Sequence, residues 1–493
     1  MKSVLTTTAF ISAALLLGRV SGFLREMLLA RQYGTTESAD AAVLMLTLPD
    51  FMVGLLLVGG FNAALVPALK KTAGPDRLAL LNRVAVGVAL LFALLTGLIM
   101  LFPSAIISVF APSLDLYTLP NFKSAFTLSL IALPLTALIG VATSYLNTVG
   151  KFIIPSLSVL IFNGVLCIYL FAVPSGNASL KWFAVAILVA TALRLGFQLG
   201  SMREAVAKPV WKLAQKHGDL FGKFIIGIFG YSIIIGAPIV FRSLYALNGD
   251  GFLARFNYAV KLFELPSALI IAPVVIVLLP KLAGMADKHP ESFAAHVKSG
   301  LTASIALAGV ATAVGLVFMP VIVSIIYQRG AISSSDAAEI AQLARILLLA
   351  LPFYAIVQIT AAALNAKGNP KAVMKNSGLA LLIAVSFYFI GQNTIGGVYT
   401  SPAGFAVFYV ASAGLNLASL WTAASLGKAF FKNTLVTIFK LSVGISPFIL
   451  LQIYTAPHPV WIELLAMIMA TLVLLGLIYS ALKPLAAMRI DRQ

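Results

Sequence analysis

Long apolar stretches alternate with short polar loops along the whole chain. Most apolar stretches last about 20 residues, the length that a helix needs to cross a bilayer, and they lack the apolar–polar alternation of membrane-barrel strands. We therefore expect an all-α membrane protein with about fourteen spans, whose bounds are good to a few residues. These spans are 8–30, 41–69, 84–110, 124–147, 152–174, 180–200, 221–246, 257–280, 299–327, 338–365, 376–392, 402–427, 433–455 and 459–482.

The composition supports this interpretation, because 60% of the residues are hydrophobic, 10% are charged and the mean hydropathy is +1.01. Soluble domains contain about 25% charged residues. The first apolar run is too long for a signal peptide, contains Arg19 and Arg25, and has no small-residue cleavage site before them. We expect it to remain in the protein as the first helix.

The formal net charge of +18 does not indicate a nucleic-acid partner, because most Lys and Arg residues lie in short loops between apolar spans. If the N-terminus is cytoplasmic, the inner loops and tails hold about 22 cations and the outer loops about 5, as the positive-inside rule expects. Both termini are therefore predicted to be cytoplasmic. The single Cys167 excludes a disulfide framework, and the four histidines lack metal-ligand spacing, so we expect neither a metal nor a cofactor.

The chain contains an internal repeat. YLNTVGKFIIPSLS at 145–158 resembles ALNAKGNPKAVMKN at 363–376, and such pairs are offset by about 213–218 residues. This offset gives each half six spans, an even number, so the halves form a parallel repeat of the kind found in transporters. We expect an N-terminal lobe with its linker, a C-terminal lobe, and two additional helices with a cytoplasmic tail. Their predicted bounds are 1–218, 219–430 and 431–493.

Charged residues inside the predicted spans are the candidates for function, because an arginine at bilayer depth costs about 2.5–3.5 kcal/mol on insertion scales. Cations outnumber carboxylates there, and guanidinium forks match phosphate oxygens, so we expect a cationic cavity between the lobes for an anionic headgroup. The candidates for substrate binding are Arg19, Arg25, Asp40, Arg242, Lys261 and Glu264, and the candidates for holding a coupling ion are Glu26 and Asp50.

These charges also have structural interpretations. Lys261 and Glu264 can form an intrahelical ion pair, since they are three residues apart, whereas the neighbours Arg25 and Glu26 are not expected to face each other. Arg25 could alternatively pair with an acid of the other lobe and only hold helices together. Arg194 is interpreted as a side chain that extends to the cytoplasmic membrane surface.

Several stretches resemble the MurJ family of lipid II flippases, within the wider multidrug/oligosaccharidyl-lipid/polysaccharide exporter superfamily. They are GRVSGFLREMLLARQYGTTESADA at 18–41, TLPDFMVGLLLVGGFNAALVPALKK at 47–71 and IIYQRGAISSSDA at 325–337. The resemblance implies two six-helix lobes, two added helices and alternating access. The family's cavity arginines fall on Arg19 and Arg25, its next acidic position on Asp40, and its helix-eight base and nearby glutamate on Lys261 and Glu264.

The resemblance further implies a monomeric, non-enzymatic transporter in the bacterial inner membrane. Its expected cargo is an undecaprenyl-diphosphate-linked saccharide, first of all the peptidoglycan precursor lipid II. The cargo is moved to the periplasmic leaflet, and the surrounding membrane lipids are the other expected partner. No GxxxxGK[ST] motif is present, so resetting is expected to use the membrane potential or a monovalent ion rather than ATP.

This chain departs from the family pattern where relatives have two arginines and a glutamate. Val53, Gly54 and Val58 stand in this region, so the cavity loses positive charge. The departure leaves open a flippase for an exopolysaccharide, capsule or O-antigen repeat-unit lipid. A cation-coupled multidrug exporter should have a carboxylate-rich cavity, and a membrane glycosyltransferase should have a sizeable catalytic outer loop; this sequence favours neither.

Overall fold

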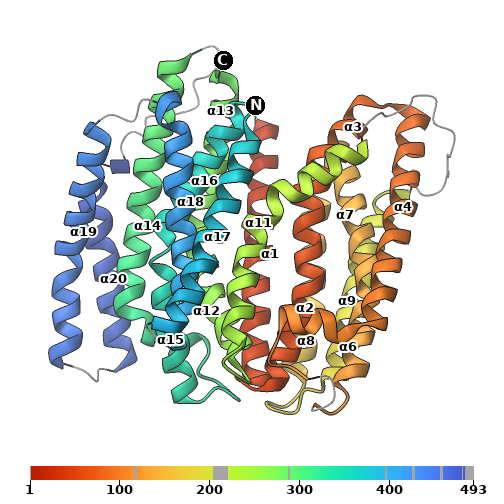
Figure 1. Ribbon diagram of the computed structural model, residues 1–493, viewed down its shortest axis with the longest axis horizontal. Helices are drawn as coiled ribbons and strands as arrows, with labels where there is room; N and C mark the ends of the chain where they lie inside the picture. Colours follow the sequence, from red (N-terminus) through yellow and green to blue (C-terminus); the bar gives the residue numbers. More distant parts are fainter. Residues whose placement is uncertain are drawn as a thin grey trace. The chain divides into compact units, whose positions relative to one another are not determined.

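The computed structural model describes residues 2–115, 119–203, 220–286, 289–394, 397–424, 428–455, 459–479 and 481–482. Every regular element among these residues is a helix (Figure 1). The predicted all-α class is confirmed. The expected linker between the lobes falls mostly at 204–219, and the expected cytoplasmic tail falls at 483–493, both outside the described residues.

The described chain divides into two compact units. The first contains Met1–Ala254 and Arg329–Ile332, and the second contains Arg255–Gln328 and Ser333–Gln493. The helices before this division are α1 (Lys2–Tyr33), α2 (Glu37–Val53), the π-helix η1 (Gly54–Leu65), α3 (Val66–Lys71), α4 (Gly74–Leu101), α5 (Pro103–Phe110), α6 (Phe122–Leu130), α7 (Ala132–Thr148), α8 (Ile153–Ala172), α9 (Leu180–Gly200) and α11 (Leu220–Ala246). The following helices are α12 (Phe252–Pro266), the π-helix η2 (Ser267–Ile271), α13 (Ala272–Met285), α14 (Pro290–Ile326), α15 (Ser334–Leu348), α16 (Leu351–Ala366), α17 (Pro370–Thr394), α18 (Thr400–Ala424), α19 (Lys428–Thr455) and α20 (Val460–Leu477).

Each of the fourteen predicted spans coincides with one of these helices or with consecutive ones. Among the described residues, ten helices are long and apolar enough to cross a membrane, and α15 with α16 is an eleventh if this pair, bent by 42°, is one span. Shorter apolar helices cover Ser232–Ala246 and Val436–Ile449. The chain is therefore a multi-span helical protein, while the exact number of fourteen stays a prediction.

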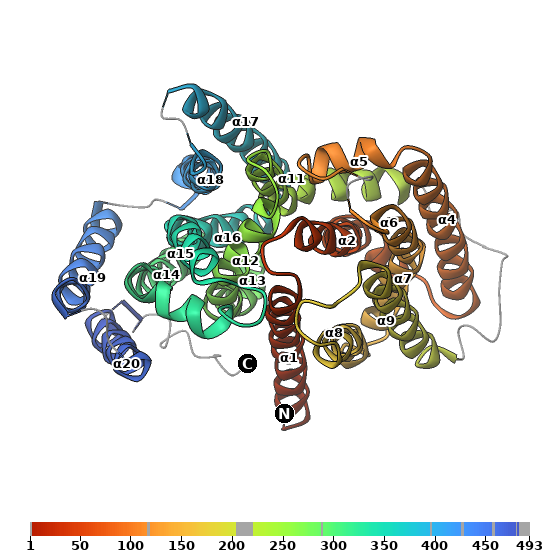
Figure 2. The same ribbon diagram turned by 90° about the horizontal axis from the view of Figure 1, so that it is seen from below.

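In the first unit α1 lies beside α8, α8 beside α9, and α7 beside α4 and α9 (Figure 2). The unit also includes α11, because this helix packs on η1: the rings of Phe61 and Phe224 are 5.4 Å apart, and Gly60 leaves room for the Phe224 ring. The predicted lobe boundary at 218 therefore does not coincide with the observed division after Ala254.

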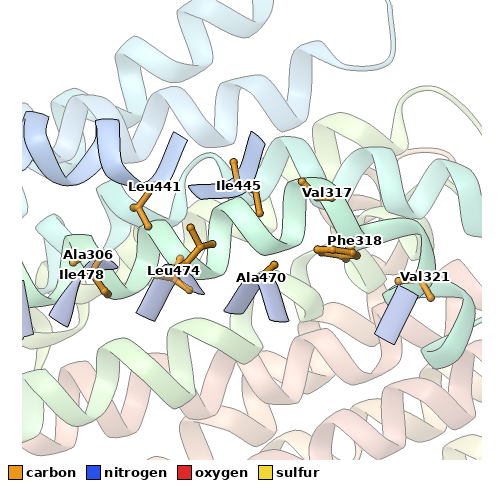
Figure 3. Packing of buried hydrophobic residues seen from close by; sticks show 10 residues of the cluster. Ala306, Val317, Phe318, Val321, Leu441, Ile445, Ala470, Leu474 and Ile478 are labelled. Atoms are coloured by element: carbon orange, nitrogen blue, oxygen red, sulfur yellow. The ribbon is translucent and has the colours of Figure 1, made fainter. Parts of the chain in front are cut away.

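The second unit contains the two C-terminal helices as part of its core. α19 and α20 pack against α14 and against each other, through Leu441 of α19, Leu474 of α20 and Phe318 of α14, all buried (Figure 3). Aliphatic and aromatic side chains fill this contact, as the packing of apolar helix faces requires. The helices predicted as a separate C-terminal segment thus belong to the second compact unit.

The internal repeat has a structural counterpart in one buried hydrogen bond. In the first unit Gln198 of α9 donates to the Ser158 hydroxyl of α8 at 2.9 Å. In the second, the side-chain amide of Asn376 on α17 donates to the side-chain oxygen Oδ1 of Asn416 on α18 at 3.0 Å. The two residues are 40 positions apart in each pair, and both pairs occupy corresponding positions of the repeat. Each half thus joins two consecutive spans by a polar contact that apolar packing alone would not supply.

Candidate functional site

Arg25 is the centre of a polar cluster inside the first unit. Its side chain is 7% exposed, and its Nη2 atom lies 2.7 Å from Glu26 Oε1 and 3.5 Å from Asp50 Oδ2. Its Nη1 donates to Asn163 Oδ1 at 3.3 Å, and its guanidinium lies 5.9 Å from the centre of the Phe162 ring. A cation, two carboxylates and an amide from α1, α2 and α8 therefore meet at membrane depth.

The expectation that Arg25 and Glu26 do not face each other is wrong. Neighbouring positions on a helix are about 100° apart, which separates their Cβ directions. The arginine side chain is long enough to span this angle, and burial of both groups favours the contact, because either charge alone would lose its hydration without a partner. Glu26 is therefore a partner of Arg25 in this conformation, with its side chain only 3% exposed.

Asn163 is a residue of this cluster that the sequence analysis missed. Besides accepting from Arg25, its amide donates to the Gly18 carbonyl at 3.3 Å and to the Ser21 hydroxyl at 3.0 Å. It thereby ties α8 to α1 and orients the guanidinium. The available signal was a lone amide side chain inside the apolar run 152–174.

Asp40 has a different environment from the one expected for a substrate ligand. It is fully buried, and its two carboxylate oxygens accept the backbone N–H groups of Gly251 and Ala254, each at 2.7 Å. These N–H groups lie at the start of α12, where helix donors lack intrahelical partners. Asp40 stabilises this helix N-terminus, so we remove it from the set of headgroup ligands.

Lys261 and Glu264 form the ion pair that their spacing predicts. The Nζ and Oε2 atoms are 2.8 Å apart in α12 of the second unit, and the two side chains are 25% and 49% exposed. Arg19 is exposed on α1. Arg242, expected in the second lobe, is buried on α11 and belongs to the first unit.

The structure thus brings Arg25, Glu26 and Asp50 together in the first unit and places Lys261 with Glu264 in the second. Two of the cations assigned to a headgroup already pair with protein carboxylates. An incoming anion must therefore compete with these carboxylates. Among the described residues, no group of three or more His, Cys, Asp or Glu side chains is arranged to hold a metal ion.

Comparison with known proteins identifies the family. The family model described as lipid II flippase MurJ matches residues 29–475. The chain belongs to the MurJ family. A relative in Aquifex aeolicus, a probable lipid II flippase MurJ, is 25% identical over 412 residues, which cover 82% of this chain and 80% of the relative.

Solved structures show that this MurJ family member has the expected fold. A structure of lipid II flippase MurJ in an inward closed conformation matches with a TM-score of 0.80 at 20% identity, covering 97% of this chain and 99% of the other. An inward-facing multidrug resistance MATE transporter of the MOP superfamily matches with a TM-score of 0.66 at 14% identity, covering 84% and 96%. MurJ membership and the apolar helices together make the chain a multi-pass bacterial membrane protein.

Arg194 of α9 is a second residue that the sequence analysis did not assign to the site. The sequence predicts that its side chain extends to the membrane surface, yet its Nε lies 3.4 Å from the buried Ser158 hydroxyl. An arginine in the last third of an apolar span is ambiguous from sequence, because only the surrounding helices decide whether its side chain turns inward.

Proposed function

We propose that this protein moves an undecaprenyl-diphosphate-linked saccharide, first of all lipid II, from the cytoplasmic to the periplasmic leaflet of the bacterial inner membrane. It does so by alternating access, as a monomer and without covalent chemistry. Membership of the MurJ family and the names of its relatives support the cargo. Both termini are proposed to be cytoplasmic, from the distribution of Lys and Arg.

The observation that supports this proposal best is the buried guanidinium of Arg25. A charged side chain at membrane depth is expensive and usually marks a path for polar or charged cargo. The guanidinium fork can hold two phosphate oxygens at once, which an ammonium cannot do in the same geometry. We assign Arg25 and the exposed Arg19 of the first unit to the diphosphate, and we keep Lys261 as the headgroup candidate of the second unit.

Energy coupling is proposed to come from the membrane potential or from a monovalent ion. One elementary charge that crosses 100 mV gains about 2.3 kcal/mol, enough to bias a conformational equilibrium roughly fiftyfold. Glu26 and Asp50 are the candidates for holding a coupling ion, and Asp50 is the more accessible, with 53% of its side chain exposed.

The cargo proposal is tested by reconstitution into vesicles with fluorescent diphosphate lipids, scoring headgroup exposure on the far leaflet. Arg25→Ala should reduce transport at least tenfold, because a charge-assisted contact stabilises by about 1.5–3 kcal/mol. Lys181→Ala, which removes an exposed cation at the start of α9, is the control and should transport normally. Near-normal transport by Arg25→Ala at full protein recovery would remove the assigned site.

A flippase for an exopolysaccharide, capsule or O-antigen repeat-unit lipid is the second candidate. It is favoured by the missing cations at positions 53–58 and by the carboxylate of Asp50 beside Arg25, which together make this region less positive than the family pattern. The same vesicle assay decides between the two, since it compares lipid II with a repeat-unit lipid at equal concentration.

A further inference from the structure

Arg194 is a cation at membrane depth, and the contacts that it makes within the first unit do not explain why an arginine stands at this position. Among the described residues, no carboxylate lies within ion-pair distance of its guanidinium, and its hydrogen bond to Ser158 is long at 3.4 Å. The carboxylate of Asp50 acts on it from farther away. An arginine kept in the membrane with so little protein compensation indicates a ligand of opposite charge.

A purely structural role for Arg194 is poorly supported, because the hydrogen bond that joins α9 to α8 forms without this arginine. Gln198 already donates to Ser158 at 2.9 Å. The corresponding contact of the second half, between Asn376 and Asn416, forms where the position that corresponds to Arg194 holds Ser412. The repeat therefore provides an internal control, in which the same interhelical hydrogen bond needs no arginine.

Both arginines contact side chains of α8 that are five positions apart, Arg25 through Asn163 and Arg194 through Ser158, and Asp50 is in direct contact with Arg25. It lies 3.5 Å from Arg25, compared with 2.7 Å for Glu26, and its side chain is 53% exposed. Because this contact is long and only the Asp50 side of it is exposed, Asp50 is displaced more easily than Glu26, whose close contact with Arg25 is buried on both sides.

The three side chains also lie at compatible depths. At 1.5 Å per residue, Asp50 and Arg194 are each about 20 Å from the predicted outer ends of α2 and α9, and Arg25 is about 12 Å from the outer end of α1. The predicted orientation therefore puts Asp50 and Arg194 nearer the cytoplasmic side than Arg25, where a headgroup from the inner leaflet arrives first.

We propose that Arg194 and Arg25 form a two-arginine site for a diphosphate within the first unit, in which Asp50 is a resident anion that the diphosphate displaces. The inference rests on the proposed function. Two phosphoryl groups match two guanidinium forks. Asp50 competes with the diphosphate for the two arginines and so lowers the affinity of the site. A transporter benefits from this lower affinity, because a headgroup that is bound too tightly would not be released.

The test uses the purified full chain in lipid nanodiscs, with inorganic pyrophosphate and farnesyl diphosphate as probes and calorimetric titration as the readout. Arg194→Gln should weaken diphosphate binding about tenfold or more, and Arg194→Lys should weaken it less. Asp50→Asn should tighten binding about fivefold, the equivalent of roughly 1 kcal/mol. Arg345→Gln, which removes a cation bonded to the Val317 carbonyl in the second unit, is the matched control and should leave binding unchanged.

The double variant Asp50→Asn with Arg194→Gln makes the test specific. If Asp50 competes with the diphosphate for the arginines, Asp50→Asn should raise the affinity only slightly in a chain that already lacks Arg194. The effects of the two substitutions on diphosphate affinity should therefore not be additive. Unchanged affinity in both Arg194→Gln and Arg194→Lys would overturn the proposal, as would an Asp50→Asn variant that binds no tighter than the natural chain. A purely structural Arg194 predicts a lower unfolding temperature in Arg194→Lys with unaltered affinity.

The same variants separate this inference from the proposed function. If the diphosphate affinities change as expected but vesicles move no diphosphate-linked saccharide, the two-arginine site stands and the proposed cargo fails. If Arg194→Gln transports lipid II like the natural chain, the two-arginine site fails while the proposed function stands.

Discussion

The buried charges of the first unit form a balanced set rather than a simple positive pocket. Arg25 is paired with Glu26 and Asp50, so its guanidinium is compensated before any ligand arrives. This compensation allows an arginine to remain in the membrane at an acceptable cost. The affinity for an anion therefore depends on which carboxylate the anion displaces from Arg25. Asp50 is the one expected to be displaced, because its side chain is exposed whereas that of Glu26 is buried.

Asp40 should behave as a structural residue. Asp40→Ala leaves the N–H groups of Gly251 and Ala254 without their buried acceptors, and we expect it to lower the free energy of unfolding by about 1–3 kcal/mol, with a smaller loss for Asp40→Asn. Thermal unfolding in detergent measures this loss. Full stability combined with lost pyrophosphate binding would instead restore Asp40 as a headgroup ligand.

The sequence predicted the kind of site better than its contacts. Charges inside apolar spans pointed to Arg25, and the spacing of Lys261 and Glu264 predicted their ion pair correctly. The Arg25–Glu26 contact was missed because helix angles describe Cβ directions and not the reach of a long side chain. Asn163 could not be assigned, because it acquires its role only when α8 lies against α1.

At the scale of elements, the hydrophobic pattern located the membrane spans, but it did not indicate how the helices group into two compact units. Each apolar run became helical, since a backbone in lipid must satisfy its own hydrogen bonds. The boundary between units depends on how α11 packs, and α11 contacts η1 of the preceding spans. The α-helix α2 continues through Pro49 to Val53, and the π-helix η1 begins at Gly54, a change of helix type that the hydrophobic pattern does not indicate.

Gly60 should be essential for the contact between η1 and α11. A Cβ atom there would lie 2.4 Å from Cε2 of Phe224, so we expect Gly60→Ala to destabilise the protein by about 1–3 kcal/mol. Phe224→Leu should partly restore stability in the double variant, because it removes the opposing ring. Gly414→Ala is the control, since its Cβ meets no atom within 4 Å. Equal unfolding temperatures for Gly60→Ala and Gly414→Ala would show that η1 and α11 do not pack this closely.

At the scale of the whole molecule, the orientation in the membrane follows from the net charge of +18 and its uneven distribution among loops. Two contacts mark opposite ends of the α8–α9 pair. Lys151 before α8 donates to the carbonyl of Ser201 after α9 at 3.0 Å, and Tyr169 near the end of α8 donates to the carbonyl of Ser179 before α9 at 2.9 Å. The first end is predicted to be cytoplasmic and the second periplasmic.

Orientation can be measured with single cysteines, because Cys167 is the only cysteine of the chain. In a Cys167→Ser background, Lys151→Cys and Lys181→Cys place a thiol at exposed positions of the two ends. A membrane-impermeant maleimide applied from the periplasmic side should label only the second variant until the membrane is permeabilised, since the excess of Lys and Arg keeps the first end in the cytoplasm. Labelling of the first variant alone would mean that the chain is inserted in the opposite orientation. The two-arginine site would then face the wrong leaflet for a headgroup made in the cytoplasm, and cargo entry through Asp50 would have to be abandoned together with the predicted topology.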